Sequence, residues 1–299
     1  MKNLLILALA APLALVGCNS SDNGGGGGGS FNKTPSLQIS NENREVIDEF
    51  AIGGVVGLES GYADFLFDDD WGDFSVNISK HAARLMDRQP ISGRNISESF
   101  KYDCDTGSEE FSVTGSGISE EGDISANGNL TIEMKSNNCV EEFGGYRDVS
   151  NGTMRFTISW TGYNDGSNTF SSLNFTIRAI NSSWYEYFDG DLEYFEEFDG
   201  ELSSSLSGVN YTNTLDMFFR GTDLDGEGVK VETLTNITGS IEDERPTAGQ
   251  WIVRGGGGTT ARYTILPNGI EVSVNDGQAE LITWAEIDAN YGSDGWDDW

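Results

Sequence analysis

The sequence is poor in the residues that most catalytic and metal sites use. It contains one His and three Cys among 299 residues. A Ser–His–Asp arrangement would have to use His81, and no G-x-S-x-G elbow is present. Zinc and transition-metal sites need several His or Cys ligands, and the Rossmann and P-loop fingerprints are also missing. The composition therefore predicts that the chain is not an enzyme.

Basic residues are scarce as well. The chain has 17 Lys and Arg against 49 Asp and Glu, which gives a formal net charge of −32. Binding to DNA or RNA needs patches of Lys and Arg against the phosphates, so nucleic acid is excluded as a partner. Adsorption of the chain to an anionic membrane surface is disfavoured for the same reason.

The one long apolar run lies at the N-terminus, where Lys2 precedes residues 4–16. Thirteen residues are too few to span a bilayer, so residues 1–17 read as a signal peptide. Leu15-Val16-Gly17-Cys18 resembles the bacterial lipobox, in which the Cys becomes the lipidated first residue. The resemblance implies a membrane contact through lipid on Cys18, and Asn19 after it implies the outer membrane.

Residues 18–36 follow as the lipidated Cys and a Gly-, Ser- and Asn-rich tether. Its r.m.s. reach is about 23 Å for a flexible chain. Because a lipobox implies an oxidising compartment, Cys104 and Cys139 are expected to form a disulfide. Two free thiols, or a metal held by both, are the alternatives.

Residues 37–97 are predicted to form a helical N-terminal cap. In residues 42–58 the apolar side chains Val46, Ile47, Phe50, Ala51 and Leu58 fall on one helical stripe. A second short helix is predicted at 79–89, where Pro90 ends it.

Residues 98–289 are predicted to form an antiparallel β domain, followed by an acidic, Trp-containing tail at 290–299. Apolar residues alternate with polar ones in five segments, and eight Asn-Gly or Asp-Gly pairs suggest hairpin turns between strands. The fold class is thus mainly β, an antiparallel meander with one or two short N-terminal helices. The pattern leaves open whether the sheet is a sandwich, an open sheet or barrel-like. The eight pairs begin at Asn127, Asn151, Asp165, Asp189, Asp199, Asp225, Asn268 and Asp276.

The chain resembles a group of uncharacterised bacterial β-rich lipoproteins. The resemblance is carried by the lipobox, the paired Cys, the Gly- and Asp-rich hairpins and the C-terminal stretches 246–253, 269–277 and 283–287. It implies an address and a fold, but the group has no activity to transfer.

Two segments are candidates for ligand binding. Residues 184–201 mix aromatic and acidic residues as sugar sites do, with Trp184, Glu186, Tyr187 and Asp189 as the candidates. The simpler interpretation is a strand pair with aromatics on the core face and acids in water.

The second segment begins at Asp223 and resembles the start of a calcium loop, with Asp223, Asp225 and Glu227 as candidate ligands. It departs from the EF-hand pattern because Leu234 stands where the last Glu ligand belongs. Turn formation alone also explains it.

These observations predict a membrane-anchored bacterial lipoprotein with a non-enzymatic structural or partner-binding role. The alternative is a calcium- or carbohydrate-binding module at the cell envelope. No cofactor is expected unless calcium binds, and the partner would be a protein or a glycan of the envelope.

Overall fold

A computed structural model of the chain describes residues 32–48, 51–52, 95–118, 124–164, 169–243 and 245–291. The predicted signal peptide, Cys18 and the predicted helix at 79–89 lie outside these ranges. Among the described residues, no helix is long and apolar enough to cross a membrane.

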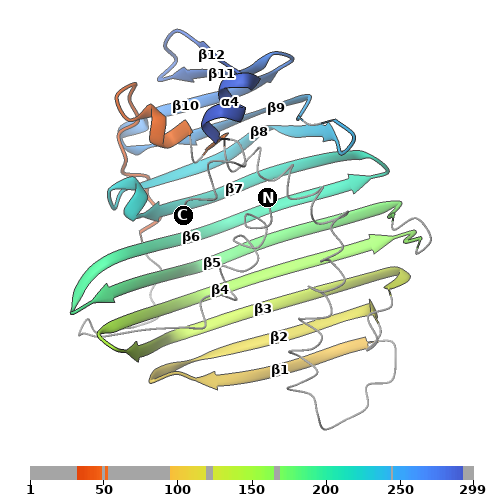
Figure 1. Ribbon diagram of the computed structural model, residues 1–299, viewed down its shortest axis with the longest axis vertical. Helices are drawn as coiled ribbons and strands as arrows, with labels where there is room; N and C mark the ends of the chain where they lie inside the picture. The colour runs from red at the N-terminus through yellow and green to blue at the C-terminus, as the bar shows by residue number, and fades with distance from the viewer. Residues whose placement is uncertain are drawn as a thin grey trace.

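Within these ranges, twelve antiparallel strands form one open sheet in which each strand pairs only with its neighbours in sequence (Figure 1). The predicted meander is therefore confirmed, and of the three alternatives the sheet is open. The first strand begins at Asn95, slightly before the predicted start at 98. The strands are β1 Asn95–Asp103, β2 Thr106–Ile118, β3 Ile124–Phe143, β4 Tyr146–Thr161, β5 Ser172–Phe188, β6 Asp191–Ser207, β7 Asn210–Gly221, β8 Gly228–Ser240, β9 Ala248–Arg254, β10 Thr260–Leu266, β11 Gly269–Val274 and β12 Glu280–Thr283.

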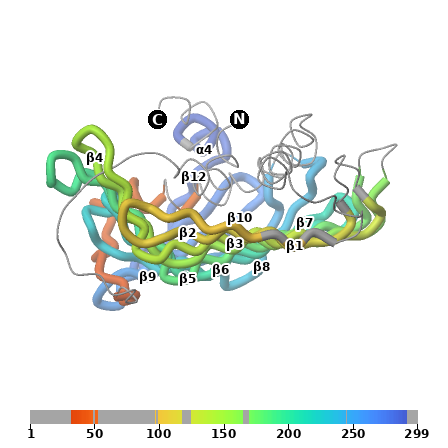
Figure 2. The backbone as a smooth tube through the Cα atoms, turned by 90° about the horizontal axis from the view of Figure 1, so that it is seen from below, coloured from red at the N-terminus to blue at the C-terminus, as the bar shows by residue number. Residues whose placement is uncertain are grey.

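Side-chain alternation gives this sheet one apolar and one polar face. In-register pairing places Ile158, Phe175 and Ser204 on one face, and their flanking residues on the other. We call these the core face and the polar face. Figure 2 shows the strands as one curved layer. The polar face carries short hydroxyl and amide side chains, among them Thr157, Ser159, Asn174, Thr176, Ser203 and Ser205.

The core face holds two clusters of buried side chains. One lies over β2–β7 and includes Phe156, Trp160 and Leu173. The other lies over β8–β12 and is centred on Trp251 and Tyr263, whose rings stack 5.1 Å apart.

The N-terminal segment docks on the second cluster. Residues 44–48 and 51–52 are helical, and Ile47 and Ala51 are buried there as the stripe predicts. Val46 is 42% exposed, so its predicted place on the buried stripe was wrong, whereas Ile52 is fully buried. The carboxylate of Asp48 is buried and accepts a hydrogen bond from the Tyr263 hydroxyl at 2.8 Å.

The C-terminal end holds a helix that the sequence analysis did not predict. Helix α4 spans Trp284–Tyr291, where the prediction continued the β domain to 289. Thr283 and Glu286 form a reciprocal capping box: the Thr283 backbone N–H donates to Oε2 of Glu286 at 2.8 Å, and the Glu286 N–H donates to Oγ1 of Thr283. Trp284 and Ile287 then pack into the second cluster.

Three of the eight predicted turn pairs lie inside strands instead. Asn127-Gly128 belongs to β3, Asn151-Gly152 to β4 and Asp199-Gly200 to β6. The pairs starting at Asp189, Asp225, Asn268 and Asp276 do lie at chain reversals, and the pair at Asp165 lies outside the described residues. Gly152 and Gly200 have a positive φ, which suits both a hairpin turn and a β-bulge, so the dipeptide alone does not separate the two.

The register shifts on strands β2 to β6 lie next to one another and form a row across these five strands. The residues with positive φ are Gly107 in β2, Asn138 in β3, Gly152 in β4, Asn181 in β5 and Gly200 in β6. They lie at the register shifts that pairing records between β2 and β6.

Side chains that precede two of these glycines hold the row together. Asn151 Oδ1 accepts the backbone N–H of Asn138 at 2.7 Å, and Asp199 Oδ1 accepts that of Asn181 at 2.8 Å. Each bulged amide, which the ladder leaves unpaired, thus gains an acceptor from the adjacent strand. We call this set of five residues the bulge row.

Replacing Gly152 with Ala is expected to destabilise the protein more than the same change at Gly190. Both glycines have a positive φ, but a Cβ at Gly152 would lie 2.2 Å from the carbonyl oxygen of Asn181, whereas one at Gly190 meets nothing within 4 Å. The cost at Gly152 should exceed that at Gly190 by about 2 kcal/mol in urea-induced unfolding. Equal costs would contradict the close approach across the bulge row.

Candidate functional site

Beyond the bulge row, strands β3–β6 continue as residues 139–151 and 182–199, which we call the distal part. Its core face carries three cross-strand rows of side chains. Directly opposed side chains in such rows lie about 4.5–5.5 Å apart. The rows are Cys139–Ser150–Trp184–Glu196, Glu141–Asp148–Glu186–Tyr194 and Phe143–Tyr146–Phe188.

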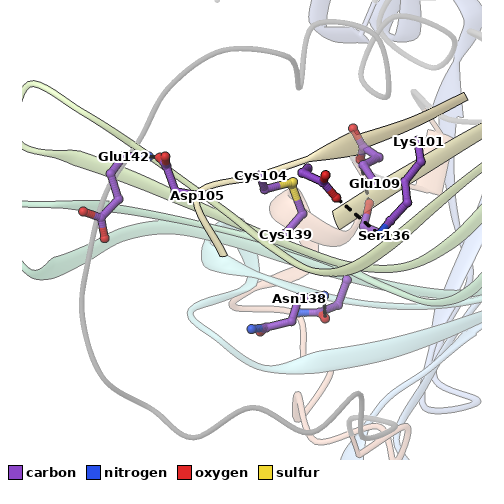
Figure 3. The surroundings of a disulfide bond; sticks show 10 residues. Lys101, Cys104, Asp105, Glu109, Ser136, Asn138, Cys139 and Glu142 are labelled. Atoms are coloured by element: carbon purple, nitrogen blue, oxygen red, sulfur yellow. Dashed lines mark hydrogen bonds and ion pairs between the residues drawn. A yellow bond between two sulfur atoms is a disulfide. The ribbon is translucent and has the colours of Figure 1, made fainter. Parts of the chain in front are cut away.

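The disulfide fixes one border of this surface. Cys104 and Cys139 are bonded, as predicted, with their Cα atoms 5.4 Å apart (Figure 3). The bond ties the connection between β1 and β2 to strand β3. Next to it, Asp105 Oδ2 accepts the backbone N–H of Glu142 at 2.8 Å, so the connection is held at two points.

A pocket opens on the core face beside the disulfide. Its wall includes three carboxylates, two aromatic side chains and one serine hydroxyl. Glu109 is held in place by Ser136, whose hydroxyl donates to its Oε1 at 2.7 Å (Figure 3). The cavity measures about 20 Å³, which is room for one cation or water, and a polyol would lie over its mouth, where carboxylates accept hydrogen bonds and aromatic faces stack. The lining residues are Tyr102, Glu109, Cys139, Glu141, Asp148, Ser150 and Trp184.

Burial perturbs several carboxylates of the distal part. It raises the pKa of Glu109, and the charge of Glu141 adds to that rise. Burial also raises the pKa of Glu186. The pKa of Glu196 is raised by burial first and then by the charges of Asp223 and Glu186, although its bond from the Tyr194 hydroxyl opposes this. Perturbed carboxylate pKa values cluster at functional sites, although structural networks perturb them as well.

The opposite face of the distal part holds a separate ion pair. Glu197 is 2% exposed; it accepts a hydrogen bond from the Tyr185 hydroxyl and pairs with Arg220 at 3.1 Å. Burial and the hydrogen bond to Glu197 raise the pKa of the Tyr185 phenol. The Arg220 guanidinium also lies over the Phe195 ring and donates to the Gly226 carbonyl. These contacts join strands β5, β6 and β7 on this face, which is a structural role.

The four residues predicted from segment 184–201 do not form one site. Trp184 and Glu186 lie on the core face. Tyr187 has the opposite parity, on the polar face, where the Arg147 guanidinium lies 5.3 Å from its ring centre. Asp189 has a φ of 49° and forms the turn between β5 and β6. Aromatics and acids thus occur on both faces, and the simple division into apolar core and acidic solvent face was wrong here.

The predicted calcium ligands occupy a tight turn between β7 and β8. Asp223 lies in the 3₁₀ turn η1, Thr222–Leu224, and Asp225 follows it with a left-handed φ of 53°. The backbone N–H groups of Asp225 and Glu227 donate to carbonyls of the same turn, both at 2.9 Å. Turn formation therefore accounts for the sequence, and Asp223 instead adds its charge to the environment of Glu196.

The two disulfide cysteines and Glu141 have potential metal-ligand atoms within 4.8 Å of one another. Both sulfurs are spent in the disulfide, which removes the thiolates that a metal ion would bind.

The sequence did not identify Glu109, Glu141 and Asp148 as site residues. They come from three strands, and only the register brings them to one pocket. The one local signal is the position of Glu141 two residues after Cys139, since alternation puts both on one face.

The raised carboxylate pKa values predict a protein that is more stable in mild acid than at neutral pH. Between the ordinary and the raised pKa, the folded chain binds more protons than the unfolded chain, so stability falls as pH rises through that window. Glu196→Gln should raise the melting temperature at pH 8 by about 2–4 °C, or about 1 kcal/mol, and flatten the pH profile. Glu271→Gln, which alters an exposed side chain of β11, is the matched control. An equal effect of both would assign the profile to overall charge.

No protein-family model, no curated protein and no solved structure is detectably similar to this chain.

Proposed function

We propose that this chain is a lipid-anchored protein of the bacterial outer membrane that binds a partner and catalyses no reaction. The observation that carries the binding role is the distal part, where rows of aromatic and acidic side chains lie in register on one face. The lipobox and the tether at 18–36 support the anchoring. In this proposal the surface that meets the partner is part of a hydrogen-bonded sheet. Such a surface suits binding because little side-chain and backbone freedom is lost when the partner binds.

Charge and anchor are consistent with each other in this proposal. A net charge of −32 opposes contact between the folded sheet and an anionic lipid surface, so lipid on Cys18 would supply the attachment. The tether then holds the sheet about 23 Å from that attachment on average.

Cys18→Ala is expected to release the protein from the membrane fraction and to abolish labelling by radioactive palmitate. The variant should keep the melting temperature of the unaltered chain, because the change is remote from the sheet. Membrane fractionation and labelling in a bacterial host measure both. Retention of the variant in washed membranes would contradict the anchoring.

The pocket beside the disulfide favours a second candidate function, the binding of calcium or a carbohydrate. Glu141 and Asp148 offer acceptors for either, and Trp184 offers a ring. Melting the protein with calcium, with EDTA and with a set of oligosaccharides tests it. A ligand at about 100 times its Kd raises the free energy of unfolding by about 2.7 kcal/mol, which raises the melting temperature.

The ligand-induced rise in melting temperature should disappear in Glu141→Gln/Asp148→Asn. It should persist in Asp225→Asn, which alters only the predicted calcium turn. If every ligand leaves the melting temperature unchanged, the pocket has no such role.

A further inference from the structure

Two neighbouring hairpins expose large apolar side chains at the end of the sheet, at the left edge of Figure 1. Phe143 is 67% exposed, Tyr146 49% and Phe188 39%. We call these three residues the aromatic tip. Phe143, Tyr146 and Phe188 form one row across β3, β4 and β5, and the rings of Tyr146 and Phe188 are 4.7 Å apart. Contiguous exposed apolar side chains of this kind mark interaction sites.

The aromatic tip is held rigidly. Gly144 and Gly145 turn the first hairpin, and Asp189 and Gly190 turn the second, all four with positive φ. The two turns are joined because the Asp189 N–H donates to the Gly145 carbonyl at 2.9 Å. A partner that docks here would therefore meet a surface that is already ordered.

Carboxylates surround the aromatic tip. Residues 141–148 and 186–193 contain seven Asp and Glu and one basic residue, Arg147. Three of the acids form the row next to the aromatic row, on the same face: Glu141, Asp148 and Glu186. Two residues along a strand separate the rows, which is about 7 Å.

The acidic row carries a cost in stability. Like charges that lie directly opposite each other on paired strands repel, and here three carboxylates are opposed across three strands. Burial raises the pKa of Glu186, so its charge is further disfavoured in the free protein. A cationic partner would relieve this repulsion on binding.

We propose that the aromatic tip docks a cationic polypeptide segment. In this segment an apolar or aromatic residue at position i is followed by Lys or Arg at position i+2. In an extended segment, residues i and i+2 project to the same side about 7 Å apart. One side chain would then pack on the Phe143–Tyr146–Phe188 row while the next places its charge on the Glu141–Asp148–Glu186 row. The charge of the surroundings favours a basic polypeptide over an anionic membrane surface. The inference rests on the binding role proposed above and names the chemistry of the partner.

The test uses the purified full-length chain and a fluorescent peptide of sequence Trp-Ser-Arg-Ser-Trp-Ser-Arg, with binding followed by anisotropy. Phe143→Ser/Phe188→Ser and Glu141→Gln/Glu186→Gln should each weaken the Kd by about tenfold, a loss of about 1.4 kcal/mol. All four side chains lie on the distal part, and melting curves check that the variants stay folded. Peptides with Glu in place of Arg, or Ser in place of Trp, should bind at least about tenfold more weakly.

Two matched variants separate the site from general charge and general apolar exposure. Leu234→Ser/Leu281→Ser removes exposed apolar side chains elsewhere, and Glu242→Gln/Glu271→Gln removes the same two charges from other exposed positions. Both should leave the Kd within about twofold, because neither pair touches the aromatic tip.

If Glu242→Gln/Glu271→Gln weakens binding as much as Glu141→Gln/Glu186→Gln does, the attraction is non-specific and the proposal fails. Binding to phosphatidylcholine vesicles that requires Phe143 and Phe188, without peptide binding, would overturn it in favour of membrane insertion. The assay uses protein in solution, so neither outcome bears on membrane attachment through Cys18. That attachment is tested separately by the Cys18→Ala fractionation.

Discussion

Register between consecutive strands is the constraint on which the rest of this structure depends. Each strand pairs only with its sequence neighbours, so a one-residue slip anywhere would move the apolar side chains of that strand to the polar face. The buried Ile158, Phe175 and Ile177 keep the register of β4 and β5, and Trp251 and Tyr263 keep that of β9 and β10. The pocket and the aromatic tip are both places where cross-strand register brings together residues that are distant in sequence.

The bulge row marks a set of register shifts that continues across neighbouring strands. Glycine or asparagine with a positive φ recurs on each strand from β2 to β6, and the bulged amides of Asn138 and Asn181 bond to side chains of Asn151 and Asp199. Beyond the row the composition changes: the core face of the distal part carries carboxylates beside its rings, whereas on the other side of the row the core face of β4 and β5 carries aliphatic and aromatic side chains. A stable sheet thus supports a distal part whose opposed carboxylates and exposed rings we propose to contact a partner.

The sequence predicted the strands well because alternation is a local property, and it predicted the disulfide because only two Cys remain after the lipobox. It did not separate the four Asn-Gly and Asp-Gly pairs that turn the chain from the three that lie inside strands, since a turn and a β-bulge both accept a positive φ at glycine. Helix α4 was recoverable from Thr283 and Glu286, which form a capping box in the sequence. The pocket was not recoverable, because Glu109, Glu141 and Asp148 meet only through pairing across three strands. In segment 184–201, the candidate ligand-binding segment, alternation divides the residues between two faces, so the residues named from the sequence do not form one site.

The distance between the two edges of the sheet tests the central claim most directly. Spin labels on cysteines introduced at Ser99 in β1 and Leu281 in β12, in a chain with Cys18→Ala, report it by pulsed electron resonance. Eleven strand spacings of about 4.8 Å give an upper limit of about 53 Å, and the curvature of the sheet shortens this. An open meander predicts a single population well above about 30 Å. A distance of about 10 Å would mean that β1 and β12 are neighbours and that the sheet is closed, which would contradict the account.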